Sequence, residues 1–162
     1  MEKFTFTVNG KRRTVEAEPN DKLLDILREN LNLTGAKRGC DNLSCAACTV
    51  VVNGKTEKSC MLQMKKVQGA EIVTVEGIAN GMDLHPIQRA LVDAGAVQCG
   101  YCIPGIVMEL YATLQANPNP TDDELFSPLN EHLCRCTGYE AIKDGAKLAV
   151  EYMKKAKTKV IA

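Results

Sequence analysis

The residues best suited to chemistry in this sequence are its eight cysteines, which fall into two groups of four. Thiolates are common ligands of zinc ions and of iron–sulfur clusters, and both kinds of centre often take four of them. One group lies in each half of the chain: Cys40, Cys45, Cys48 and Cys60 in the first, and Cys99, Cys102, Cys134 and Cys136 in the second. This division predicts two separate metal centres.

The first group of cysteines has the spacing C-x4-C-x2-C with a more distant fourth member. This is the spacing of plant-type 2Fe–2S ferredoxins. Zinc sites more often combine short paired spacings such as CxxC, which this group lacks. We therefore predict that it holds a 2Fe–2S cluster. Such a cluster is anionic with its four thiolates, and Lys37 and Arg38, just before Cys40, either offset that charge or are simply solvated.

The second group of cysteines joins a CxxC pair to Cys134 and Cys136, which are one residue apart and cannot easily bridge each other. Each pair comes just before an expected helix N-terminus. Unpaired N–H groups and the helix dipole at such a position stabilise an anionic centre and lower the pKa of thiols. Zinc would gain from the same arrangement, so the residues alone leave both zinc and a 2Fe–2S cluster open.

The composition is that of an ordinary globular protein, with 45% hydrophobic and 25% charged residues and a formal net charge of zero. Without a basic surplus, neither nucleic acid nor an anionic membrane is an expected partner. The first residues alternate polar and apolar, which predicts neither a secretory signal nor a membrane span. We therefore expect a cytoplasmic protein whose thiols stay reduced, which disfavours a disulfide framework.

Strand signals dominate the N-terminal half of the chain. Alternating apolar residues predict a half-buried strand, and the dipeptides Asn9–Gly10 and Asn53–Gly54 predict type I′ hairpins. The expected elements are a strand at 3–8, a return strand at 13–17, a helix opening at Pro19, a strand at 49–52 and a short strand at 72–75. Two hairpins with a helix between them predict a small mixed sheet packed on one helix, as in a β-grasp fold.

The C-terminal half carries helix signals. The expected helices open at His85–Pro86, at Pro104, at a Thr121–Glu124 capping box and at a Thr137–Glu140 capping box, which predicts a four-helix bundle. We place a ferredoxin-like domain at 1–76, a linker at 77–82 and an all-helical domain at 83–162. Neither histidine is expected to bind metal, because each group of four thiolates is already complete. His85 is expected to start a helix, and His132 to pack inside the protein or lie at its surface.

Three motifs in order resemble the iron–sulfur small subunit of the molybdenum hydroxylases, the group of xanthine dehydrogenase, aldehyde oxidoreductase and carbon monoxide dehydrogenase. They are Gly39–Val50, Gln98–Gly105 and Leu133–Tyr139, and the resemblance extends over essentially the whole chain. It implies an α+β fold with an N-terminal β-grasp, ferredoxin-like domain and a C-terminal four-helix domain. It also implies that each domain holds one 2Fe–2S cluster, the second group of cysteines included.

The function implied by the resemblance is electron transfer within a multi-subunit oxidoreductase, with no substrate chemistry on this chain. Electrons would leave a molybdenum–pterin cofactor on a large subunit, cross the second cluster and then the first, and reach FAD on a medium subunit. The complex would be a dimer of heterotrimers. In similar proteins the residues that match Gln98 and Cys136 lie beside the pterin, so these two are candidate pterin contacts.

The chain departs from the family in its first cysteine loop, where Leu43 and Ala46 stand at positions usually occupied by glycine. Glycine permits a positive φ and a close approach of backbone to sulfide. We expect the cluster to assemble nonetheless, with Leu43 covering it and changing its solvent access and reduction potential.

Two other functions fit part of the sequence. A soluble two-cluster ferredoxin would shuttle electrons between other enzymes, although diffusing carriers often use a charged face for steering and this chain is neutral overall. A structural zinc module would use the same thiolates without redox chemistry.

Overall fold

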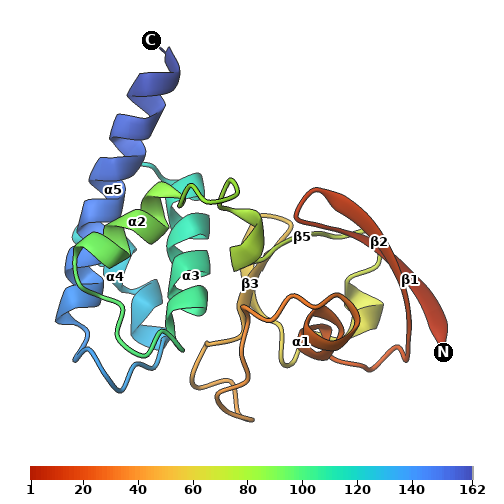
Figure 1. Ribbon diagram of the computed structural model, residues 1–162. Helices are drawn as coiled ribbons and strands as arrows, with labels where there is room; N and C mark the ends of the chain where they lie inside the picture. Colours follow the sequence, from red (N-terminus) through yellow and green to blue (C-terminus); the bar gives the residue numbers. More distant parts are fainter. Residues whose placement is uncertain (162) are drawn as a thin grey trace.

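The computed structural model describes the backbone of residues 1–161 and the side chains of residues 1–157, so that the last residue of the expected helical domain, 162, lies outside it. A sheet half and a helical half lie side by side (Figure 1). Strand β3 (Thr49–Val52) and helix α3 (Ile103–Ala116) form the boundary between them.

The sheet has five strands in the order β2-β1-β5-β3-β4, with β1 and β5 parallel and the other neighbours antiparallel. Besides β3, the strands are β1 (Glu2–Val8), β2 (Lys11–Ala17), β4 (Lys55–Lys58) and β5 (Glu71–Val73). Both Asn–Gly turns have the positive φ values of a type I′ hairpin, 49° and 75° at Asn9–Gly10 and 50° and 81° at Asn53–Gly54. The predicted mixed sheet with two hairpins is confirmed.

One short helical segment covers the sheet. It consists of α1 (Leu23–Asp25) and a π-helical turn, η1 (Ile26–Asn30), which bury Leu23, Leu24 and Leu27 against the apolar side chains of β1. The helix opens at Leu23 rather than at Pro19, because residues before it form a turn in which the Asp21 carboxylate accepts a hydrogen bond from the Glu18 N–H. Shorter 3-10 turns follow at η2 (Met64–Lys66) and η3 (Val75–Gly77).

The helical half contains α2 (Pro86–Asp93), α3, α4 (Asp122–Phe126) and α5 (Glu140–Ile161). The Thr121–Glu124 capping box is present at the start of α4. This helix is short because Pro128 cannot continue it, and Leu129 lies in the 3-10 turn η4 (Pro128–Glu131) that follows. Within the described part of the chain, no helix combines the length and the apolar character needed to cross a bilayer.

The two halves pack closely because β3 is buried on both faces. Val50 belongs to the core of the sheet half, whereas Val51 belongs to the core of the helical half. A buried polar contact adds to this boundary: the His132 ring lies 3.2 Å from the Glu109 carboxylate, which also accepts a hydrogen bond from Thr56 of β4. His132 is therefore a packing residue, one of the two expected roles.

Gly105, in the first turn of α3, allows a close approach between the halves. A Cβ atom there would lie 2.4 Å from the carbonyl oxygen of Ala46, in the first cysteine loop. We expect Gly105→Ala to lower the free energy of unfolding by about 1–3 kcal/mol, because either the helix or the loop must shift. Denaturant unfolding of the full chain measures this, and a variant as stable as the wild type would contradict the tight packing of α3 on the loop.

Candidate functional site

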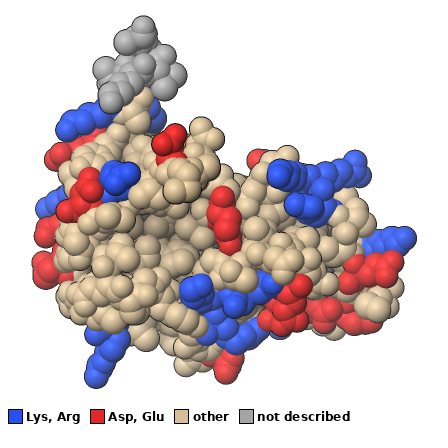
Figure 2. All heavy atoms as spheres, viewed as in Figure 1, with Lys and Arg blue, Asp and Glu red and all other residues tan. Residues whose placement is uncertain are grey.

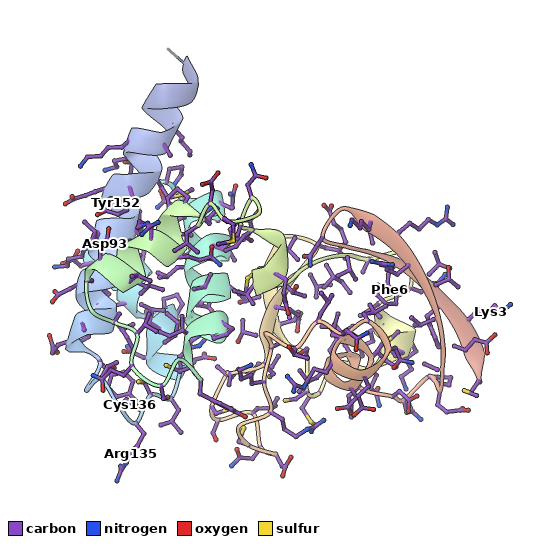
Figure 3. All side chains as sticks on the ribbon, in the orientation of Figure 1. Lys3, Phe6, Asp93, Arg135, Cys136 and Tyr152 are labelled. Atoms are coloured by element: carbon purple, nitrogen blue, oxygen red, sulfur yellow. The ribbon has the colours of Figure 1, made fainter. Side chains whose placement is uncertain are left out.

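The loops that carry the cysteines meet at one end of the molecule. In Figure 1 the loops before α3 and α5 and the loop before β3 all reach the lower edge, and Figure 3 places Cys136 there with Arg135 pointing away from the body of the protein. Of the eight thiols, those of Cys99 and Cys136 are exposed, that of Cys40 is half-buried and the others are buried.

Backbone N–H groups surround the sulfurs of the first cysteine group. The N–H of Cys45 lies 3.4 Å from Sγ of Cys40, and the N–H of Ala47 lies 3.5 Å from Sγ of Cys45. Hydrogen bonds from the N–H groups of Asn42 and Cys45 lower the pKa of Cys40 to about 6. These donors favour a thiolate, the form that binds metal.

The four thiols of the first group lie as two pairs. Cys40 and Cys45 are neighbours. Burial, followed by the contact with the Cys40 thiol, raises the pKa of Cys45. Burial likewise raises the pKa of Cys60 to about 12, and the neighbouring thiol of Cys48 adds to the rise. The loop before β3 thus supplies both sulfurs of the first pair, Cys40 and Cys45. The second pair joins Cys48, at the end of that loop, to Cys60, which follows β4.

The loop keeps the glycine-like conformation despite its substitutions. Leu43 has a φ of 68° and Ala46 a φ of 56°, both in the left-handed region. The Ala46 carbonyl accepts hydrogen bonds from the N–H and the hydroxyl of Thr49, and the Leu43 carbonyl accepts one from Lys58. These hydrogen bonds therefore hold a conformation that L-residues adopt at a cost of about 1–2 kcal/mol each.

The second cysteine group lines a cavity of about 170 Å³. Cys45 of the first group and Tyr101 also border this cavity. The thiols again lie as two pairs. Burial, followed by the neighbouring thiol of Cys134, raises the pKa of Cys102 to about 12, and Cys136 lies beside Cys99, which raises its pKa.

Thr137 and Tyr139 support Cys134 instead of capping α5. The Thr137 hydroxyl lies 3.1 Å from Sγ of Cys134 and accepts a hydrogen bond from the Tyr139 N–H, while the Cys134 N–H donates to the Tyr139 hydroxyl. Burial, the largest single cause, would raise the pKa of Cys134, but hydrogen bonds from Thr137, from the Cys136 backbone and from the Cys102 thiol together lower that pKa. The predicted capping box at Thr137–Glu140 is therefore wrong: Tyr139 has a φ of 73°, and α5 begins at Glu140.

Sequence reasoning missed the roles of Thr137 and Tyr139 as cysteine partners. The available signal was a hydroxyl residue three positions after Cys134 and directly before a glycine. That signal is shared by turns and by helix N-termini, so the sequence alone does not identify Thr137 as a cysteine partner.

Paired sulfurs fit a centre with two metal ions, each bound by one pair. A mononuclear tetrahedral zinc site needs four ligands around one point. Both groups, with their N–H and hydroxyl donors to sulfur, suit a 2Fe–2S cluster better.

Direct contacts join the two cysteine groups. The N–H of Leu133, next to Cys134, donates to the carbonyl of Cys45 at 3.1 Å. The Tyr101 hydroxyl donates to the carbonyl of Arg38 at 2.5 Å, and its ring lies against Gly39, where a Cβ would come within 3.3 Å of it. The backbone of one ligand loop therefore touches that of the other.

The charged residues before Cys40 are engaged locally. Arg38 forms ion pairs with Asp25 at 2.5 Å and with Asp41 at 3.7 Å, and the Lys37 ammonium donates to the carbonyl of Thr34. Arg38 is thus largely neutralised by carboxylates. His85 caps α2 as expected, since its Nδ1 accepts the N–H of Ile87, and burial lowers its pKa.

The candidate pterin contacts lie at the surface beside the second cysteine group. Gln98 and Cys136 are both exposed, and the Gln98 amide has no hydrogen bond among the described residues. Exposed apolar side chains surround them, contributed by Val97, Tyr101, Leu133 and Tyr139. Figure 2 shows few charged groups on the lower part of the helical half, whereas both signs of charge crowd the lower edge of the sheet half.

Two protein families match the chain in succession. The family described as 2Fe-2S iron-sulfur cluster binding domain matches residues 6–72, and that described as 2Fe-2S binding domain matches residues 74–147. The nicotinate dehydrogenase small FeS subunit of Eubacterium barkeri is 42% identical over 153 residues, which are 93% of this chain and 98% of that protein.

Solved structures share the fold over nearly the whole chain. A chain of quinoline 2-oxidoreductase from Pseudomonas putida 86 superposes with a TM-score of 0.88 at 36% identity, covering 95% of this chain and 96% of that one. Aldehyde oxidoreductase from Desulfovibrio gigas gives a TM-score of 0.91 at 35% identity, covering 96% of this chain but 18% of its own. The same fold therefore occurs as a separate subunit and as one segment of a longer chain.

We expect Leu43→Gly to raise the free energy of unfolding by about 1 kcal/mol, because glycine adopts a φ of 68° without strain. Denaturant unfolding measures the gain, and an unchanged or lower stability would contradict the strain.

The same variant tests whether the Leu43 side chain shields the first cluster from solvent. We expect Leu43→Gly to change the midpoint potential of that cluster, and an unchanged potential would contradict the shielding role of Leu43.

Thr137→Val keeps the shape of the side chain but removes its hydroxyl. We expect the midpoint potential of the second cluster to fall, because a hydrogen bond to a ligand sulfur stabilises the more negative, reduced state. Thr137→Ser is the control and should retain the wild-type potential. Potentiometric titration followed by EPR measures both variants, and equal potentials in wild type and Thr137→Val would refute the role of the hydroxyl.

Proposed function

Since the chain belongs to the iron–sulfur small subunits of the molybdenum hydroxylases, we propose that it relays electrons from a molybdenum–pterin centre on a large partner subunit, through two 2Fe–2S clusters, towards FAD on a medium subunit. The clusters would supply one-electron redox chemistry. The protein residues hold the clusters, keep them close together and exclude water from most of their ligands.

The observation that carries this proposal is the direct contact between the two cysteine groups. The hydrogen bond from Leu133 N–H to the Cys45 carbonyl links a residue adjacent to one proposed ligand with a proposed ligand of the other cluster. Cys45 also borders the cavity that the second group lines. Two independent zinc modules would have no need of such a junction, whereas an electron relay requires its centres to be adjacent.

The proposed ligands follow the pairs of sulfurs. The first cluster takes Cys40, Cys45, Cys48 and Cys60, and the second takes Cys99, Cys102, Cys134 and Cys136. We further propose a β-grasp, ferredoxin-like domain at 1–76, a linker at 77–82 and a four-helix domain at 83–162. The separate cores of the sheet half and the helical half support this division.

The electron entry port is proposed at Gln98 and Cys136. Cys136 is an exposed ligand, so a redox partner can approach this cluster closely. The unpaired Gln98 amide offers a donor and an acceptor, which suits the edge of a pterin. The exposed apolar side chains around both residues would be covered by the large subunit, which a freely diffusing ferredoxin would not need.

The complete complex is proposed to be a cytoplasmic dimer of heterotrimers. Relatives named for nicotinate, quinoline and aldehyde point to N-heteroaromatic compounds or aldehydes as its substrate class. The substrate would bind on the large subunit, where the molybdenum–pterin centre is proposed to lie.

Purification of the chain from its native source tests the assignment. We expect it to elute with a molybdenum-containing and a flavin-containing subunit; elution alone would favour the free carrier.

In the complex, Cys136→Ala should abolish reduction of the flavin by substrate while the first cluster remains visible by EPR. Met82→Ala, at a side chain that is 98% exposed, is the control and should leave flavin reduction intact. Retained flavin reduction in Cys136→Ala would refute the entry port.

A further inference from the structure

Lys58, at the end of β4, connects the segments that carry ligands of both proposed clusters. Its ammonium group donates to the carbonyl of Leu43 at 2.9 Å, at the crest of the first cysteine loop. The same group lies 3.1 Å from the carboxylate of Glu131 in η4, which leads to Leu133 and Cys134. Its own strand leads to Cys60 two residues later.

The Lys58 side chain is more enclosed than an ordinary surface lysine. It is 29% exposed, whereas its partner Glu131 is 68% exposed. Lys58 borders a cavity of about 360 Å³ that is also lined by Leu43, Thr56, Glu109 and Glu131. Because water and salt screen an enclosed charge less than an exposed one, Lys58 acts on its surroundings more strongly than its carboxylate partner does.

Other cations near the first cysteine loop are more fully paired with protein groups. The charge of Arg38 reaches Cys60, where it opposes the rise in the pKa of that thiol. Arg38 lies between the carboxylates of Asp25 and Asp41, and Lys37 is directed to the carbonyl of Thr34. Within the described part of the chain, Lys58 has one carboxylate partner, which is more exposed than Lys58 itself, and its ammonium group donates a hydrogen bond to the loop backbone. The charge of Lys58 is therefore less fully opposed by carboxylates than that of Arg38.

We infer that Lys58 is a positioning residue for the first cluster: it holds Leu43 in its left-handed conformation, and its charge raises the reduction potential of that cluster. The inference rests on the proposed function, because it requires a cluster bound by the first cysteine group. Reduction adds one electron from the second cluster to a centre that is already anionic, so a nearby positive charge stabilises the product. A higher potential at the first cluster favours electron flow in the proposed direction.

Potentiometric titration followed by EPR, on the full chain with both clusters, tests the inference. The first-cluster signal is identified as the one that Cys60→Ser alters. Lys58→Met should lower the potential of the first cluster more than that of the second. Lys58→Arg keeps the positive charge and should retain the wild-type potential of the first cluster. Glu131→Gln should raise the potential of the first cluster, because it removes the opposing negative charge. Lys66→Met is the control and should leave the potential unchanged. Lys66 borders the same cavity and is exposed, and its side chain makes no hydrogen bond among the described residues.

The two variants are expected to shift the first-cluster potential in opposite directions, which separates an effect of charge from a general loosening of the structure around the loop. Lys58→Met and Glu131→Gln break the same ion pair, so a purely structural bridge would move the potential in one direction in both. Shifts of equal sign, or an unchanged potential in Lys58→Met, would overturn the inference while the cluster assignment stands. If Lys58→Met fails to assemble, Glu131→Gln decides: a raised potential supports the inference and an unchanged or lowered one overturns it. A wild-type chain without a first-cluster signal would overturn the proposed function and this inference with it.

Discussion

The backbone hydrogen bond from Leu133 to the carbonyl of Cys45 joins the two cysteine loops, and the remaining structure brings those loops to the same place. The doubly buried strand β3 fixes the sheet half against the helical half, and Gly105 lets α3 approach the backbone of Ala46. An electron relay depends on this proximity, because each centre must lie next to the one that follows it.

Proximity is obtained with a strained backbone that hydrogen bonds hold in place. Leu43, Ala46 and Tyr139 all have positive φ, and their conformations are supported by Lys58, Thr49 and Thr137. Each half has a small core, and bound clusters would contribute to its stability, since metal binding to a site that forms only on folding is also folding free energy. Folding and cluster assembly are thus expected to be coupled in this chain.

Elements with local causes were predictable from the sequence, and contacts with tertiary causes were not. Asn–Gly turns, the alternation in β1 and the capping box at Thr121 act within a few residues, and the structure contains all three. Thr137 was misassigned because its hydroxyl serves Cys134 rather than α5. The amide of Leu133 and the ammonium of Lys58 have no local signature, because their partners lie far away in the chain.

The most direct measurement is EPR of the full chain, purified without oxygen and reduced with dithionite, alongside analysis of its metals. The account predicts iron and acid-labile sulfide in equal amounts, and two distinct 2Fe–2S signals that broaden one another because the clusters are adjacent. A colourless protein that contains zinc, or a single signal that Cys99→Ser and Cys134→Ser leave unchanged, would contradict it.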